Sequence, residues 1–223
     1  MGETNQLTAE DSHRLAAYRA TPSGTPRGRL VVIQEIFGVN SHIKKLCDGF
    51  AADGYVALAP ALFDRVERDY ASGYAPADID RGRATRGKLS LDDVMKDTQA
   101  AIDELKKAGQ PVGVVGYCFG GTVAWLSATR LDGVAAAVGY YGGGIGDAAG
   151  EQPKCPVLLH FGETDASIPK EHYEKVQTLH PKLPVHIYPA GHGFNCDERG
   201  SYHEPSARQA RERTLAFFRQ HVG

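Results

Sequence analysis

The stretch Gly-Tyr-Cys-Phe-Gly-Gly at residues 116–121 constrains the fold more than any other part of the chain. A β-branched apolar run at 112–115 precedes it and an apolar segment follows it, which indicates a strand, a sharp turn and a helix. This is the order of a nucleophile elbow, G-x-S-x-G, with Cys118 where serine is usual. Gly116 and Gly120 lack a Cβ, so the strand and the helix can approach each other at a strained turn.

Two interpretations of Cys118 are open at this point. The helix that follows directs its N-terminal N–H groups and the positive end of its dipole toward the sulfur, which favours a nucleophilic thiolate. The alternative is a core residue in an ordinary strand-to-helix turn, because free cysteine is among the most buried residue types.

Strands and helices are expected to alternate along the whole chain. The pattern predicts strands at 12–20, 30–35, 55–59, 112–115, 134–140, 156–161 and 185–188, and helices at 41–53, 90–108, 123–128, from about 169, and at 206–221. Residues 63–88 show no clear apolar period and are expected to form a loop or short-helix excursion over the active face. The sequence therefore predicts one α/β domain over residues 1–223, with a mostly parallel sheet covered by helices on both faces.

The composition narrows the class of partner. A formal net charge of −2 argues against nucleic acid or an anionic membrane surface. No uncharged apolar run approaches the length of a membrane span, and the polar start of the chain lacks the pattern of a secretory signal. Four cysteines without a CxxC pair indicate reduced thiols in a cytoplasmic protein. We expect a monomer that acts on a small molecule.

An elbow nucleophile requires an orienting carboxylate and a histidine base, which follow it in that order along the chain. Asp165 comes just after one predicted strand and His192 just after another, so both loops open at the same sheet edge as Cys118. Each residue alone is more simply a turn residue, but together they predict a catalytic triad. Glu163 is the competing acid, and Asp165 is preferred because it lies deeper in its loop.

The remaining histidines lie among charged neighbours or within predicted strands. No pair of them has the spacing and the neighbouring carboxylates that are typical of a metal site. The sequence therefore predicts no metal and no cofactor.

Together with the segments Gln34–Asn40, Tyr140–Gly142 and Gly191-His192, these motifs resemble the dienelactone hydrolase family of α/β-hydrolases. The resemblance extends from about residue 12 to the C-terminus. It implies that Cys118 attacks an ester or lactone carbonyl and forms an acyl-thioester. It also implies that His192 acts first as base and then as acid, while Asp165 orients His192.

The resemblance implies a role for Glu35, which would hold the resting thiol and move away as substrate binds. From the residues alone, a carboxylate at a strand end either accepts the thiol hydrogen bond or is an ordinary ion-pair partner. The backbone N–H groups of Ile36 and Phe119 are the expected oxyanion hole.

One departure from the family pattern concerns the substrate. Members that act on dienelactone bind its carboxylate with two arginines, one from the middle excursion and one four residues after the catalytic histidine. The second position is Cys196 here, and Arg81 is the choice for the first, with Arg83 and Arg86 as alternatives. Losing one arginine predicts a substrate that is neutral or differently shaped. Tyr141 is expected to line the pocket or to pack at the strand end.

Two other function classes fit the same residues. One is a small-molecule binding protein that has lost the chemistry. The other is a thiol-redox protein in which Cys196 forms a disulfide with Cys118.

Overall fold

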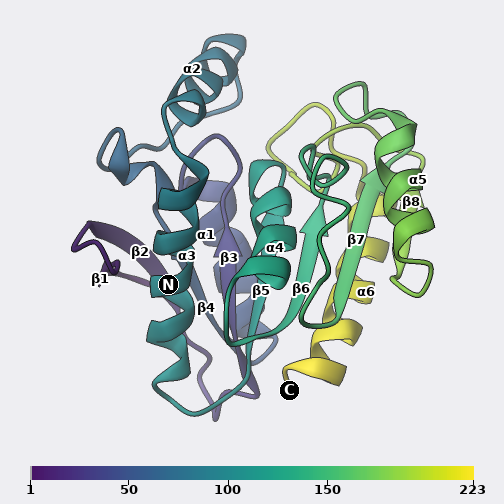
Figure 1. The fold of residues 1–223 in the computed structure, drawn as a ribbon. Helices are drawn as coiled ribbons and strands as arrows, with labels where there is room; N and C mark the ends of the chain where they lie inside the picture. Colours follow the sequence, from purple (N-terminus) through teal and green to yellow (C-terminus); the bar gives the residue numbers. More distant parts are fainter. Residues whose placement is uncertain (1) are drawn as a thin grey trace.

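The computed structural model describes residues 2–223, and one sheet of eight strands runs through them (Figure 1). The strand order is β1-β2-β4-β3-β5-β6-β7-β8. From β4 to β8 all neighbouring strands are parallel, whereas β2 is antiparallel to both β1 and β4. The strands are β1 Glu3–Thr8, β2 Arg14–Ala20, β3 Gly28–Ile33, β4 Tyr55–Pro60, β5 Val112–Tyr117, β6 Val134–Tyr140, β7 Val157–Gly162 and β8 Val185–Tyr188.

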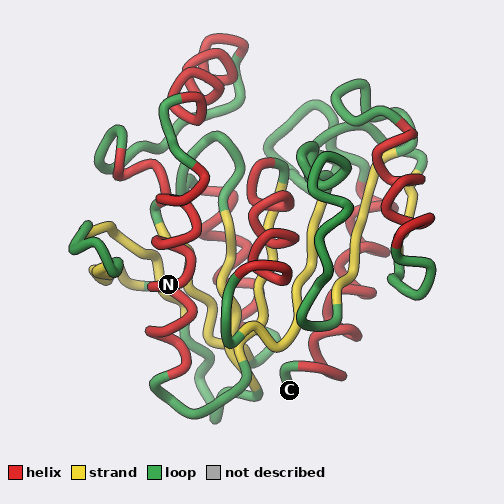
Figure 2. Tube along the Cα trace, in the orientation of Figure 1, coloured by secondary structure: helices red, strands yellow, loops and turns green. Residues whose placement is uncertain are grey.

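Helices cover both faces of the sheet, as the sequence predicts (Figure 2). The helices are α1 Ser41–Ala52, α2 Pro76–Gly87, α3 Leu91–Lys106, α4 Phe119–Arg130, α5 Lys170–Leu179 and α6 Glu204–His221, with a 3-10 turn at Leu62–Arg65. On one face Phe50 of α1 packs against Phe218 of α6, with ring centroids 6.4 Å apart. On the other face α3 and α4 lie side by side, and Trp125 of α4 meets His180 at the end of α5.

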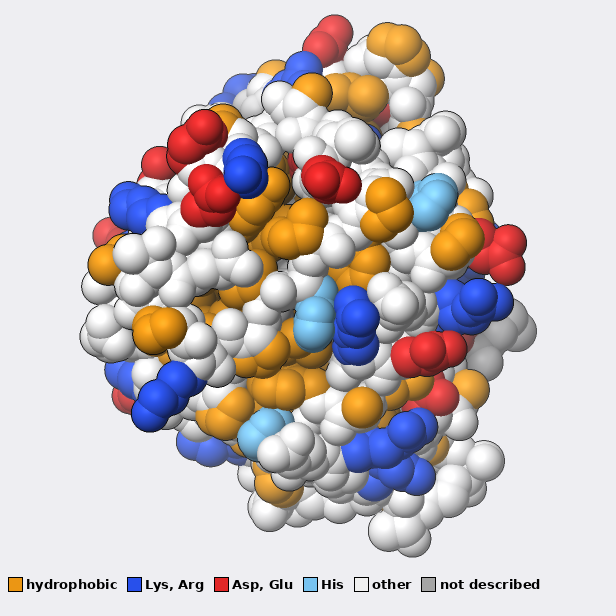
Figure 3. Space-filling model, turned by 90° about the vertical axis from the view of Figure 1, so that its right-hand side faces the viewer, with side chains coloured by type: hydrophobic (Ala, Val, Ile, Leu, Met, Phe, Trp, Pro, Cys, Tyr) orange, Lys and Arg blue, Asp and Glu red, His pale blue; other side chains and the backbone are white. Residues whose placement is uncertain are grey.

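The two covered faces explain why the central strands have continuous apolar runs. Every residue of β4, β5 and β7 is buried, so none of these strands needs a polar face. Seen from the β8 edge, hydrophobic side chains gather toward the middle of the molecule and charged side chains surround them (Figure 3). Within residues 2–223, no helix combines the length and apolarity that a membrane crossing requires.

The predicted strands lie within two residues of the observed ones, and two differences stand out. Strand β1 is absent from the sequence prediction, because an edge strand buries little and only Leu7 of its six residues is buried. The excursion at 63–88 contains the full helix α2, which buries only Gly82 and Thr85 and so carries no apolar stripe.

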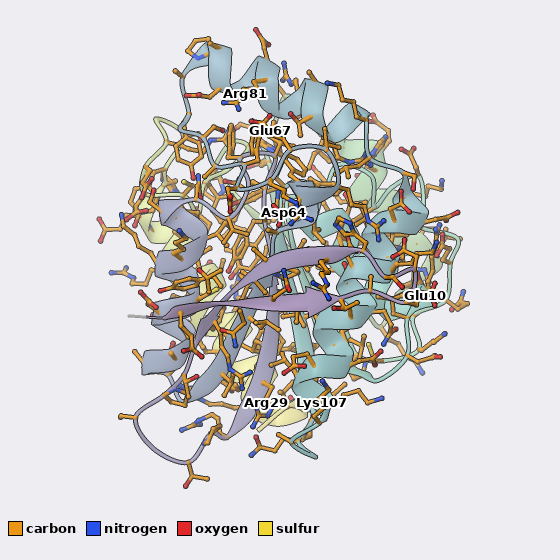
Figure 4. All side chains as sticks on the ribbon, turned by 90° about the vertical axis from the view of Figure 1, so that its left-hand side faces the viewer. Glu10, Arg29, Asp64, Glu67, Arg81 and Lys107 are labelled. Atoms are coloured by element: carbon orange, nitrogen blue, oxygen red, sulfur yellow. The ribbon has the colours of Figure 1, made fainter. Side chains whose placement is uncertain are left out.

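Helix α2 stands above the carboxyl ends of the strands (Figure 1). It approaches the loop after β3 closely, since a Cβ on Gly82 would lie 2.4 Å from the Ile36 carbonyl oxygen. The base of the excursion is tied to the sheet by Asp64, whose carboxylate accepts a hydrogen bond from the Ala16 N–H at 2.8 Å (Figure 4). The excursion therefore covers the carboxyl edge of the sheet, where the sequence places it.

The turn between β5 and α4 has the strained geometry of a nucleophile elbow. Cys118 has φ 55° and ψ −117°, a conformation that L residues seldom adopt. A Cβ on Gly116 would lie 1.8 Å from the Gly120 carbonyl oxygen, and one on Gly120 would lie 2.4 Å from that of Ile33. Gly116 therefore allows the close approach of β5 and α4, and Gly120 allows that of α4 and the end of β3.

We expect Gly116→Ala to lower the free energy of unfolding by at least about 3 kcal/mol, because its Cβ meets rigid backbone rather than a movable side chain. Gly87→Ala is the matched control, since a Cβ there has no heavy atom within 4 Å. It should leave stability unchanged or raise it by less than about 1 kcal/mol. Urea denaturation measures both, and equal stability of the two variants would contradict the packing argument.

Candidate active site

The structure brings Cys118, His192 and Asp165 together at the carboxyl edge of the sheet. The His192 Nε2 atom lies 3.1 Å from the Cys118 sulfur, and its Nδ1 atom lies 2.7 Å from Asp165 Oδ2. The three side chains follow β5, β8 and β7, which are parallel and therefore end at the same edge. In this arrangement the imidazole can act as a base toward the thiol, while the carboxylate orients the imidazole.

The orientation of Asp165 is set by its own loop. Its Oδ1 atom accepts a hydrogen bond from the Ser167 N–H at 2.8 Å, the side-chain to backbone contact typical of a turn. Asp165 is only 6% exposed, whereas Glu163 points to solvent. Of the two acids considered from the sequence, Asp165 is the one that contacts His192.

The environment of His192 favours its charged form. Burial opposes the charge, but hydrogen bonds to Asp165 and Cys118 outweigh it and raise the pKa of His192 to about 10. A cationic imidazole beside a sulfur is the arrangement that activates a cysteine as a nucleophile. The geometry thus places a protonated His192 beside the Cys118 sulfur.

The backbone N–H groups of Ile36 and Phe119 have no hydrogen-bond acceptor within residues 2–223. Phe119 is the first residue of α4, where an N–H has no partner inside the helix. Ile36 follows β3, the neighbour of β5 in the sheet. Two free donors at this edge have the character of an oxyanion hole.

Glu35 lies deep in the same region and is only 1% exposed. Its Oε1 atom accepts a hydrogen bond from Arg199 Nη1 at 3.2 Å, and it makes no hydrogen bond to Cys118 within the described part of the chain. Sequence reasoning missed Arg199, which belongs to the same loop as His192 and lies three positions after Cys196. A search for the next arginine in that loop would have found it.

The three arginines considered from the excursion lie in different surroundings. Arg81 pairs with Glu67 on the exposed side and stacks on Tyr70 (Figure 4). Arg83 is exposed. Arg86 packs over Phe119, with its guanidinium carbon 4.5 Å from the ring centroid, and burial lowers its pKa. Arg86 is therefore the one that contacts the elbow.

Tyr141 is fully buried, and its ring centroid lies 5.1 Å from that of His192 in an edge-to-face arrangement. Its hydroxyl group has no hydrogen-bond partner among residues 2–223. Tyr141 therefore packs at the strand end, as one interpretation predicts, and it also borders the triad.

One further group of polar side chains meets in this region. Glu35, His42 and Cys196 are all buried, and one potential ligand atom from each lies within 4.8 Å of the others. The sequence predicts no metal site, because these residues share no motif spacing. They contact one another only through the fold.

A mostly parallel sheet with a nucleophile-type turn after β5, an acid after β7 and a histidine after β8 defines an α/β-hydrolase fold. The dienelactone hydrolase family model matches residues 15–222, and the chain belongs to that family. The resemblance noted from the sequence motifs is thereby confirmed.

Individual relatives cover nearly the whole chain. A Synechocystis sp. protein assigned as a carboxymethylenebutenolidase is 34% identical over 92% of this chain and 91% of its own length. A protein from Azospirillum brasilense with the same assignment is 35% identical over 97% of this chain and 98% of its own length. The crystal structure of a protein from Klebsiella pneumoniae assigned as a dienelactone hydrolase superposes with a TM-score of 0.86 at 30% identity, covering 99% of this chain and 100% of that one.

The hydrogen bond to Cys118 is among the causes of the raised pKa of His192. We therefore expect Cys118→Ser to lower the pKa of His192 below about 10, because a neutral hydroxyl group replaces the sulfur. NMR titration of protein with ¹⁵N-labelled histidine measures it. Cys155→Ser is the control, because Cys155 precedes β7 and so lies at the opposite end of the strands from the triad. If the pKa of His192 in Cys118→Ser equals that in the wild type, the sulfur does not stabilise the imidazolium.

Proposed function

We propose that this protein hydrolyses carboxylic ester or lactone bonds through a Cys118–His192–Asp165 triad and an acyl-thioester intermediate. The observation that carries the proposal is the continuous contact from Asp165 through His192 to Cys118, at 2.7 and 3.1 Å. The strained backbone at Cys118 and the family relatives assigned as carboxymethylenebutenolidases support the same chemistry.

The first half-reaction begins with attack of the Cys118 thiolate on the substrate carbonyl. The N–H groups of Ile36 and Phe119 donate hydrogen bonds to the oxygen that becomes negative. His192 then gives its proton to the leaving alkoxide, and a thioester remains on Cys118.

In the second half-reaction, His192 takes a proton from water, which attacks the thioester and releases the acid. Asp165 accepts the hydrogen bond from His192 Nδ1 throughout and so keeps Nε2 directed at the sulfur. Because these reaction steps use only protein groups and water, the proposed reaction needs no cofactor.

Glu35 is proposed as the gate of the thiol. The Glu35–Arg199 hydrogen bond corresponds to the position in which Glu35 is turned away from Cys118. In that position the Cys118 sulfur contacts His192. In the other position Glu35 would accept the thiol hydrogen bond, as the family resemblance implies. Arg199 is thus the partner that holds the carboxylate away from the nucleophile.

The preferred substrate is proposed to be neutral. Cys196 replaces an arginine of the family pattern, and the guanidinium of Arg199 is already paired with Glu35. Arg81 is likewise paired, with Glu67. An anionic ester would have to displace one of these carboxylates, whereas a neutral lactone or ester would not.

The thiol-redox alternative has less support. All four cysteines are free, and the hydrogen-bond partner of the Cys118 sulfur is His192. Cys196 lies instead beside Glu35 and His42.

We expect Cys118→Ala to abolish turnover of an activated phenyl ester and of a simple lactone, because no other group can form the thioester. Wild-type protein trapped with the activated ester should gain one acyl group at Cys118 in peptide mass spectrometry. In the wild type, kcat/KM should be higher for neutral substrates than for a dienelactone bearing a carboxylate.

A wild-type protein that neither turns over these esters nor gains an acyl group would exclude the hydrolase proposal and favour the binding protein. A preference for the carboxylate-bearing substrate would contradict only the argument from the paired arginines.

Asp165→Asn should lower kcat by about 10²-fold to 10⁴-fold, because an amide can stabilise the wrong tautomer of His192 and cannot stabilise the imidazolium. Glu163→Gln removes the same charge two positions away and should leave kcat within a factor of two. Steady-state kinetics with the activated ester measures both. If both variants lose kcat equally, then the negative charge of the loop, rather than the orientation of His192, determines kcat.

A further inference from the structure

We propose that Glu35, His42 and Cys196 form a buried binding site for a divalent transition-metal ion, with Zn²⁺ as the best match. One potential ligand atom from each side chain lies within 4.8 Å of the others. The site lies beside the triad and shares no residue with it. Its one overlap with the proposed function is Glu35, the proposed gate, which a bound ion would hold on the Arg199 side.

The first observation is burial without hydrogen-bond partners. Glu35 is 1% exposed, His42 2% and Cys196 0%. Within residues 2–223, Glu35 Oε2 and His42 Nε2 have no hydrogen-bond partner. A buried polar atom without a partner costs free energy, so two of them on residues of one cluster indicate that a ligand belongs there.

The second observation is the support behind His42. Its other ring nitrogen, Nδ1, lies 3.3 Å from Asp197 Oδ1. A carboxylate in that position favours a proton on Nδ1, which leaves the Nε2 lone pair free to coordinate a metal. This carboxylate–histidine arrangement is the one that usually orients metal-bound histidines.

The donor set selects the class of metal. A thiolate, an imidazole and a carboxylate together suit Zn²⁺, and the hard cations Mg²⁺ and Ca²⁺ prefer oxygen ligands alone. On binding, Cys196 loses its thiol proton to solvent and a metal–sulfur bond forms. The bound state is charge-balanced: Glu35, Asp197 and the Cys196 thiolate carry three negative charges, and the ion with Arg199 carries three positive ones.

The cluster needs only a small contraction to hold the ion. Tetrahedral ligands at the usual zinc bond lengths lie about 3.3 to 3.7 Å apart, so the side chains must close in by about 1 Å. A surface cavity of about 360 Å³ borders the cluster at His42 and is also lined by Asp197.

A bound ion would connect three separate parts of the chain. Glu35 follows β3, His42 lies in the first turn of α1, and Cys196 belongs to the loop that carries His192. Coordination would therefore fix that loop to the body of the protein. Glu35 keeps its second oxygen for Arg199, since only Oε2 is unpartnered.

The test uses the full-length Cys118→Ser protein, which removes the other thiol that has a histidine beside it. Equilibrium dialysis against Zn²⁺ should show one bound ion per chain, and Co²⁺ should give a thiolate-to-cobalt charge-transfer band and the strong visible bands of a tetrahedral site. Cys196→Ser and His42→Asn in this background should each lose the binding, whereas Cys155→Ser should bind as before.

Asp197→Asn changes an exposed side chain that is not a ligand, so it keeps the proposal testable if the buried variants fail to fold. It should weaken Zn²⁺ binding about 10-fold to 100-fold. No bound ion in the Cys118→Ser protein would overturn the proposal. So would binding that survives Cys196→Ser, or affinity that Asp197→Asn does not change in a folded protein.

Discussion

The close approach of α4 to β5 at Gly116 and to the end of β3 at Gly120 is the constraint on which the rest of the site depends. The elbow at Cys118 forms only because each glycine leaves room for a carbonyl oxygen of a neighbouring segment. The strained turn exposes the sulfur, starts α4 at Phe119 and leaves the Phe119 N–H without an intrahelical partner. The proposed nucleophile and one proposed oxyanion donor thus arise from one backbone feature.

The parallel sheet then supplies the remaining groups. Because β3, β5, β7 and β8 all end at the same edge, the loops that follow them meet there although they are far apart in the chain. Asp165 is fixed by its own turn and in turn orients His192. Each loop therefore needs only one well-placed side chain, and the rigid strands set the distances between them.

Much of this was predictable from the sequence because it rests on chain order and strand ends. Cys118, Asp165 and His192 follow three predicted strands in the order that the fold requires. Strand β1 was not predictable, since an edge strand that buries only Leu7 has no apolar pattern. The contact between Glu35 and Arg199 was also missed, because the direction of a side chain in an irregular loop leaves no periodic signal.

Helix α2 combines a mostly exposed surface with one close contact at the proposed site. Only Gly82 and Thr85 of its twelve residues are buried, so most of its surface can change sequence at little cost to the core. Yet Gly82 rests directly against the Ile36 carbonyl, next to a proposed oxyanion donor. Substitutions on the outer turns of α2 can therefore reshape the rim of the site over evolutionary time, while the part of the helix that touches the catalytic edge stays the same.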